Sequence, residues 1–171
     1  MKIIQKIPSV AVFLALSCIN FTSLGAFQPA QSGNNTNVFF RIHRVVDGDT
    51  FWLINAKGQK EKIRFIGIDA PEAKNYGKKV KQYYGKESTN FLTNYLKGKK
   101  VRLEYDVQRY DQYGRTLAYV YLEDGTFLNE YLIKNGYAKV VTFPPNVKYH
   151  RQFVIAERYA RQHQLGMWRN N

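Results

Sequence analysis

The chain has 171 residues, which is enough for one domain with its own core and excludes two ordinary domains. Its formal net charge is +13, and 15% of its residues are aromatic. Surplus Lys and Arg attract polyanions, so nucleic acid is the first expected partner and an anionic membrane or cell wall the second. A secreted basic protein whose charge only keeps it soluble fits this composition equally well.

The first 26 residues have the pattern of a secretory signal. Two lysines precede the uncharged apolar run "PSVAVFLALSCINF", and small residues follow in "TSLGA". The run is short for a spanning helix, so we expect cleavage after Ala26 and export rather than a stable membrane anchor. Cys18 is the only cysteine and leaves with this segment, so no disulfide is expected afterwards. Residues 27–37 are predicted to be a flexible leader.

The following pattern is that of β-strands. Stretches rich in β-branched and aromatic residues are separated by the turn signals "DGD" and "AKGQK", and the first three predict a meander. The polar, lysine-rich stretch "AKNYGKKVKQYYG" after the meander is predicted to be a mobile loop. The predicted strands are 38–46, 50–55, 62–68, 100–107, 116–122 and a short extended segment at 137–141.

Three helices are expected between and after these strands. The first has apolar residues at helical spacing and is followed by a glycine; the last has a buried stripe formed by Tyr149, Phe153, Ala156 and Ala160. Strands that come first and helices that come later fit a small β-barrel with appended helices, in one domain at 38–169. The predicted helices are 86–97, "FLNEYLIKNG" and about 146–164.

Acidic side chains occur at two turns of the predicted meander. In "VVDGDT", Asp47 and Asp49 flank a glycine, although Asp-Gly-Asp by itself is more often only a hairpin turn. "IDAPE" then places Asp69 and Glu72 after a strand whose neighbour carries Asp49. Pro71 restricts the backbone between them and holds the two acids at a defined separation. The alternative is an ordinary strand-ending turn with solvated acids.

Two arginines belong to the same set. Arg64 precedes Asp69 by an odd interval, so the two side chains would face opposite sides of a regular strand unless a bend near Gly67 brings them together. Arg115 follows Gly114 in "DQYGR", where the glycine permits a turn. Each arginine alone more often pairs with a surface acid. Their joint occurrence with three acids at turns and strand ends favours a functional site.

The residue types of this set suit metal-assisted hydrolysis of a phosphodiester. Two aspartates and a backbone carbonyl offer the hard oxygen ligands that calcium or magnesium prefers. Zinc and Cys-His catalysis lose support, because the three histidines do not cluster in the sequence and the cysteine is removed. Hydrolysis needs a base and positive charge around the phosphorus. Glu72 can serve as the base, and Arg64 and Arg115 can neutralise the phosphate oxygens.

Three motifs carry a resemblance to a known family. "VVDGDT", "IRFIGIDAPE" and "DQYGRTLAYVYL", followed by "LNEYLIKNGYAKV", resemble the staphylococcal nuclease family from about residue 39 to Trp168. The resemblance implies a mainly β fold with helices, namely an OB-fold five-stranded β-barrel with three α-helices. It also implies a calcium-dependent endonuclease that acts on DNA and RNA with little sequence specificity and releases 3′-phosphate ends.

The same resemblance implies roles for individual residues. Asp49, Asp69 and the backbone carbonyl of Ala70 would hold Ca²⁺, with Asp47 in a supporting position. Glu72 would activate the attacking water, and the two arginines would bind the scissile phosphate. Many family members have threonine where this chain has Ala70. That difference removes a hydroxyl and keeps the carbonyl.

The nucleotide-stacking positions of the family are less clear in this chain. The segment after "YAKVV" is shortened to "TFPPN", in which Phe143 is the candidate replacement for a stacking tyrosine. Tyr113, in the "DQYGR" turn, either contacts the nucleotide or packs within the turn.

Two functions remain open from the sequence. One is a secreted, monomeric, metal-dependent phosphodiesterase. The other is a catalytically inactive OB-fold module that binds single strands or an acidic partner. The joint presence of the acids and arginines favours the enzyme, because an inactive module has no need of them.

Overall fold

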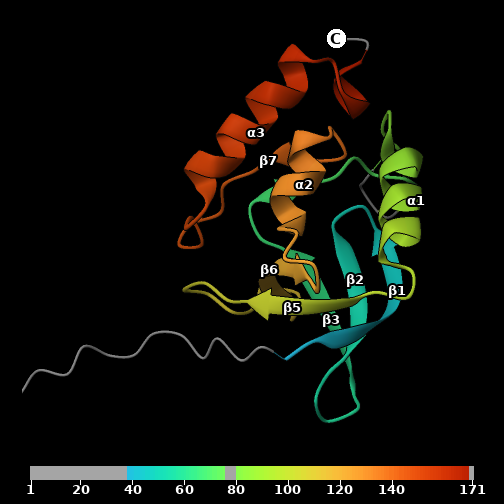
Figure 1. Ribbon diagram of the computed structural model, residues 1–171, viewed down its shortest axis with the longest axis vertical. Coiled ribbons are helices and arrows are strands. Elements are labelled where there is room, and N and C mark those ends of the chain that lie inside the picture. The colour runs from blue at the N-terminus through green and yellow to red at the C-terminus, as the bar shows by residue number, and fades with distance from the viewer. Residues whose placement is uncertain (1–37, 76–79, 170–171) are drawn as a thin grey trace, which may run out of the picture. The chain divides into compact units, whose positions relative to one another are not determined.

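The computed structural model describes residues 38–75 and 80–169 (Figure 1). The predicted signal segment at 1–26 and the predicted leader at 27–37 lie outside the described residues. So do residues 76–79, in the middle of the predicted lysine-rich loop. In the part of the chain that is described, no helix has the length and apolar character needed to cross a membrane.

Five strands close into a barrel in the order β1-β2-β3-β6-β5. Neighbouring strands are antiparallel except for β3 and β6, which are parallel. The barrel and its three helices confirm the predicted OB-type fold, and the first three strands form the predicted meander. The barrel strands are β1 (Phe40–Asp47), β2 (Thr50–Ile54), β3 (Lys60–Phe65), β5 (Lys100–Glu104) and β6 (Thr116–Leu122).

Alternating apolar side chains fill the barrel interior. Phe51 and Leu53 on β2, together with Ile63 and Phe65 on β3, are almost completely buried, whereas the residues between them are partly accessible. Burial of each such side chain stabilises the fold by roughly 1.5–3 kcal/mol. This core fixes the ends of β2 and β3, where the predicted acidic and basic residues lie.

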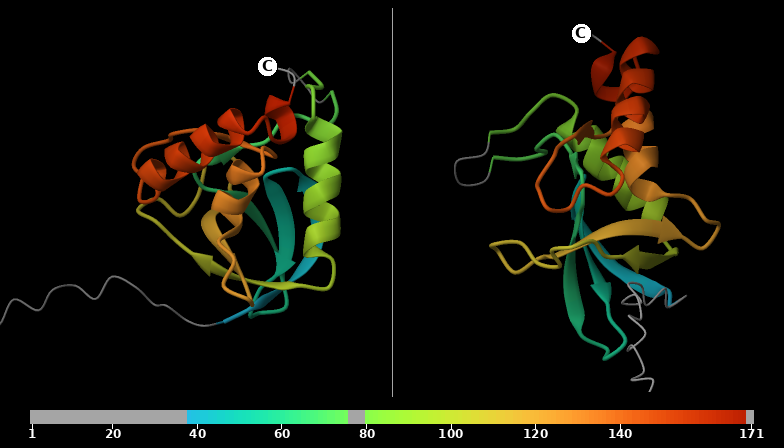
Figure 2. Two further views of the ribbon diagram at one scale, coloured as in Figure 1. Left: turned by 45° about the horizontal axis from the view of Figure 1, so that its top comes forward. Right: turned by 90° about the vertical axis from the view of Figure 1, so that its left-hand side faces the viewer.

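Three helices and one short 3₁₀ helix pack outside the barrel (Figure 2). Helix α1 packs against β1, and α2 packs against both β6 and α3. The buried side of α3 carries Phe153, Ala156 and Ala160, as the sequence predicts, while Tyr149 precedes the helix and is only half-buried. The helices are α1 (Gly85–Leu96), α2 (Leu128–Lys134), α3 (His150–Gln162) and the 3₁₀ helix η1 (Gly166–Trp168).

Helix α3 begins later than the predicted residue 146. The side chain of Asn146 accepts a hydrogen bond from the backbone N–H of Gln108 and donates one to its carbonyl, each at 2.7 Å. These bonds tie the segment before α3 to the β5–β6 loop instead of to a helical turn.

A two-stranded sheet outside the barrel joins β4 (Ile68–Asp69) to β7 (Lys139–Val140). The predicted strand 62–68 is therefore broken, because β3 ends at Phe65 and Gly67 has a φ of +77°. A side chain at Gly67 would also meet the ring of Phe153, with its Cβ 2.6 Å from Cε2. This break is the bend near Gly67 that the sequence permits, and it turns the chain so that Arg64 and Asp69 face the same side.

Candidate active site

Arg64 joins two carboxylates that come from separate turns. Its Nη1 lies 2.8 Å from Oδ2 of Asp49, and its Nη2 donates a hydrogen bond to Oδ1 of Asp69 at 3.2 Å. The Arg64 side chain is only 12% exposed, so this ion pairing is shielded from water. The structure thus brings together three of the residues that the sequence singles out.

The "DGD" turn fixes the position of Asp49. The Asp47 carboxylate accepts a hydrogen bond from the Asp49 N–H at 3.1 Å, which is typical of an Asx turn. The Asp49 carboxylate in turn accepts hydrogen bonds from the Thr50 hydroxyl at 2.9 Å and from the Ala70 N–H at 2.8 Å. Asp49 is therefore oriented both by its neighbours in the turn and by the backbone of Ala70. The carbonyl of Ala70 is itself a predicted metal ligand.

Burial makes Asp49 electrostatically unusual. Desolvation raises its pKa to about 6, and the nearby Asp47 carboxylate adds to this effect, while Arg64 and the Ala70 N–H oppose it. A buried carboxylate with raised pKa gains from further positive charge. Perturbation of this kind by burial and specific neighbours is typical of functional sites, although structural ion pairs produce it as well.

Asp69 has a second basic partner that the sequence analysis missed. Nζ of Lys139 lies 3.4 Å from Oδ2 of Asp69, because the two residues are directly paired between β4 and β7. The segment 137–141 was predicted to be extended, but nothing in its own pattern indicates that it pairs with the strand end that carries Asp69.

Arg115 is held by Asp111, another residue that was not predicted. Its Nε donates a hydrogen bond to Oδ2 of Asp111 at 2.6 Å, while Oδ1 accepts the backbone N–H groups of Tyr113 and Arg115 at 2.9 and 3.0 Å. Burial alone would raise the pKa of Asp111, but these hydrogen bonds and the guanidinium charge outweigh it and lower that pKa. The interval of four residues within "DQYGR" is the signal that could have identified this pair.

Both arginines line one cavity of about 510 Å³. We call it the arginine cavity; its other lining residues include Asp69, Tyr113 and Phe143. The side chains of Tyr113 and Phe143 are exposed, at 75% and 66%, so their ring faces are accessible to a ligand. The structure therefore places both predicted stacking residues beside the charged groups.

Glu72 lies outside the residues that line this cavity, three positions after Asp69. Its backbone is anchored, since its N–H donates to Oε1 of Gln82 at 3.2 Å and its carbonyl accepts the Gln82 N–H at 2.9 Å. The backbone of Gly85, at the start of α1, lies so close that a Cβ there would be 2.2 Å from the Glu72 carbonyl oxygen. The role of Glu72 as a base stays a prediction.

The donors in this site fit a hard cation. Asp49 and Asp69 converge on one guanidinium and offer carboxylate oxygens, which calcium and magnesium prefer. Among residues 38–75 and 80–169, no three His, Cys, Asp or Glu side chains gather into a metal-binding cluster. A cation at this site would thus need backbone or substrate oxygens beside the two aspartates.

Comparisons with known proteins agree with the motifs and the barrel. Residues 62–170 match the family model described as "Staphylococcal nuclease homologue". The chain is 39% identical to the thermonuclease of Staphylococcus hyicus over 161 residues, which is 94% of each chain. It is 44% identical to the thermonuclease of Staphylococcus intermedius over 75% of each chain. Endonuclease YncB of Bacillus subtilis (strain 168) is 36% identical over 87% of this chain and 70% of its own length.

Proposed function

The chain belongs to the staphylococcal nuclease family, and we propose that it is a calcium-dependent endonuclease that hydrolyses phosphodiester bonds in DNA and RNA. The observation that carries this proposal is the arrangement around Arg64, which contacts Asp49 and Asp69 and shares a cavity with Arg115. Acids for a hard cation and guanidiniums for a phosphate thus occupy one site.

The two arginines bind the scissile phosphate. Nη1 of Arg64 contacts Asp49 and Nη2 contacts Asp69, so the two carboxylates hold this guanidinium at the cavity that it shares with Arg115. Arg115 is oriented through its Nε by Asp111, and we assign its terminal nitrogens to the same phosphate. Guanidinium groups suit this role because they present paired N–H donors that match phosphate oxygens.

Glu72 accepts the proton of the attacking water. The water oxygen bonds to phosphorus, the bond from phosphorus to the 5′ oxygen breaks, and that oxygen takes a proton from solvent water. Glu72 then returns the proton that it accepted to the solvent. The products are a 3′-phosphate and a 5′-hydroxyl. The arginines stabilise the negative charge that develops on the phosphate oxygens during this step.

Asp49, Asp69 and the carbonyl of Ala70 would hold the calcium ion. When bound, the ion supplies positive charge beside the phosphate and lowers the pKa of water. Asp47 supports this set by orienting Asp49 through its backbone N–H.

Low sequence specificity follows from the residues around the arginine cavity. Tyr113 and Phe143 offer ring faces on which any base can stack, and the arginines bind the backbone. Neither contact distinguishes one base from another. We also propose that the enzyme acts after export, on the basis of the signal pattern in the first 26 residues.

The decisive experiment measures metal-dependent cleavage by the chain purified without residues 1–26. We expect degradation of plasmid DNA and of single-stranded RNA in calcium, and none in a chelator. Treatment of the products with phosphatase should be required before a polymerase can extend them, because their 3′ ends carry phosphate. Binding of nucleic acid without cleavage in calcium would instead identify an inactive binding module.

A further inference from the structure

The loop between β5 and β6 lines two cavities. Tyr113 and Arg115 line the arginine cavity, whereas Tyr105, Arg109 and Tyr110 line a second cavity of about 570 Å³. We call this second cavity the barrel groove; it extends from the loop along β2 and β3 to the turn between those strands. The loop thus separates the two cavities and borders both.

Aromatic rings and cations dominate the barrel groove. Among its described lining residues the only carboxylate is that of Glu61, which accepts hydrogen bonds from the Thr116 hydroxyl at 2.7 Å and from the Asn55 amide at 3.4 Å. The groove is therefore positively charged and suits a polyanion. Its aromatic residues are Phe40, Trp52, Tyr105 and Tyr110, and its cations are Lys57, Lys60, Lys62 and Arg109.

The rings and cations are interleaved. Nζ of Lys62 lies 5.8 Å from the centre of the Trp52 ring, and Cζ of Arg109 lies 3.8 Å from that of Tyr105. Tyr110 is 54% exposed and lies beside Arg109. Cation–π pairs alone stabilise many folds. An exposed ring within a cationic groove, however, is the combination on which proteins stack unpaired bases while they neutralise the backbone.

We propose that the barrel groove is a second nucleic-acid site, which binds a single-stranded part of the substrate outside the arginine cavity. Bases stack on Trp52 and Tyr110, and Lys57 and Lys62 neutralise phosphates. Single strands are favoured because the base faces of a duplex are already stacked on each other. The link to cleavage rests on the proposed nuclease function: a strand held in the arginine cavity crosses the β5–β6 loop to reach the groove.

Binding without cleavage tests the groove directly. We measure the fluorescence anisotropy of labelled polythymidine in a chelator, which prevents cleavage. A strand of about 20 nucleotides is longer than the 4–16 nucleotides that one OB fold covers. We expect Trp52→Ala to raise the Kd about fivefold or more and Trp52→Phe to restore most of the affinity. Lys57→Ser should lower the slope of log K against log salt by about 0.7.

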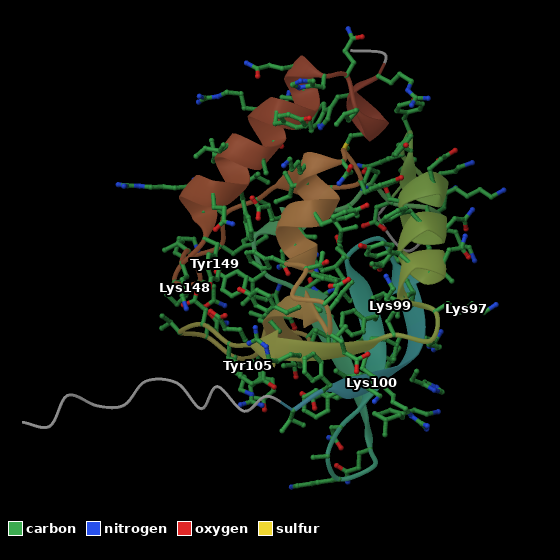
Figure 3. All side chains as sticks on the ribbon, in the orientation of Figure 1. Lys97, Lys99, Lys100, Tyr105, Lys148 and Tyr149 are labelled. Atoms are coloured by element: carbon green, nitrogen blue, oxygen red, sulfur yellow. The ribbon has the colours of Figure 1, made fainter. Side chains whose placement is uncertain are left out.

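Lys97→Ser is the matched control. Lys97 is an exposed lysine at the end of α1, does not line the groove, and lies well apart from the groove residue Tyr105 in Figure 3. Its substitution removes the same charge as Lys57→Ser, so an equal effect of both would overturn the groove proposal in favour of general attraction. An unchanged Kd in Trp52→Ala and an unchanged salt slope in Lys57→Ser would overturn it as well.

Tryptophan fluorescence gives a readout that does not depend on a destabilising substitution in the groove. The chain has two tryptophans, so Trp168→Phe leaves Trp52 as the only one. We expect polythymidine to quench the fluorescence of this variant in a chelator as bases stack on the ring. Unchanged fluorescence at saturating strand would overturn the assignment of Trp52. Heparin tests whether a polyanion without bases gives the same quenching, which would also count against base stacking.

Cleavage assays separate this proposal from the proposed function. A dinucleotide occupies only the arginine cavity, whereas a long strand also reaches the groove. If the groove binds substrate, Lys57→Ser and Trp52→Ala should raise KM several times more for the long strand than for the dinucleotide. Equal changes for both substrates would refute the groove. A wild-type protein that cleaves neither substrate would refute the nuclease proposal and leave the binding measurements to decide on the groove.

Discussion

Gly48 and Ala70 approach each other so closely that a Cβ added to Gly48 would lie 2.6 Å from the Cβ of Ala70. This contact brings the "DGD" turn against the segment after β4. It allows the Ala70 N–H to reach the Asp49 carboxylate at 2.8 Å. The glycine is required here by space, and its φ lies outside the left-handed region.

Gly48→Ala should therefore push the "DGD" turn, which carries Asp49, away from the segment after β4, which carries Ala70. We expect the free energy of unfolding to fall by about 1–3 kcal/mol, because a methyl group is forced into a packed contact. Turnover per folded molecule should also fall, since Ala70 moves away from Asp49. Chemical denaturation and initial rates measure both effects. Gly98→Ala is the control: it introduces backbone strain at a φ of +74° in open space and should preserve turnover.

Glu72→Gln tests the assignment of the base. Glutamine has nearly the same shape but cannot accept the proton of water, so turnover should fall by about 10²–10⁴-fold. The Kd for single-stranded DNA in a chelator should change little. Glu87→Gln removes the same charge from an exposed position in the first turn of α1 and should retain full activity. A normal rate for Glu72→Gln would remove this residue from the base role.

Asp111→Asn should destabilise the fold in a pH-dependent way. The folded pKa of Asp111 is lower than its unfolded value of about 3.9, so the ionised carboxylate stabilises the fold above that pH. This contribution is lost as the pH falls through the folded pKa. At neutral pH we expect a loss of about 1–2 kcal/mol, which shrinks as the pH is lowered below about 4. Urea unfolding of the wild type and of Asp111→Asn at a series of pH values measures this loss of unfolding free energy. A loss that stays the same at every pH would exclude the charge of Asp111 as its cause.

Calcium should stabilise the protein as well as activate it. A ligand that binds only the folded state at 100 times its Kd adds about 2.7 kcal/mol to the free energy of unfolding. Thermal unfolding with and without calcium should show the corresponding rise in Tm. Asp69→Asn, at a half-buried position, should reduce that rise. If the rise is equal in both proteins, Asp69 is not a ligand.

Residue composition and spacing along the chain predicted the strands and helices whose formation depends on neighbouring residues in the sequence. Enrichment in β-branched and aromatic residues located 50–55 and 116–122, and helical spacing located 86–97, each within one residue of β2, β6 and α1. From the residues alone, the odd interval between Arg64 and Asp69 placed them on opposite faces unless a bend near Gly67 intervened, and the structure has that bend.

The parts that the sequence analysis missed depend on contacts between distant segments. Lys139 reaches Asp69 only because β7 pairs with β4, and Asn146 binds the backbone of Gln108 across 38 positions. The barrel groove was missed for a related reason. Residues of the single β5–β6 loop line two different cavities. The spacing of residues in the sequence does not show which of them lines which cavity.

The pairing of β4 with β7 also sets the moment at which the site is completed during synthesis. Asp69 is paired with Lys139, and the Gly67 carbonyl accepts the N–H of Val141 at 3.1 Å. Because chains emerge from the ribosome N-terminus first, a nascent chain that extends only through the barrel strands lacks these partners. Completion of the candidate site, in which Lys139 contacts Asp69, therefore waits for the last quarter of the polypeptide.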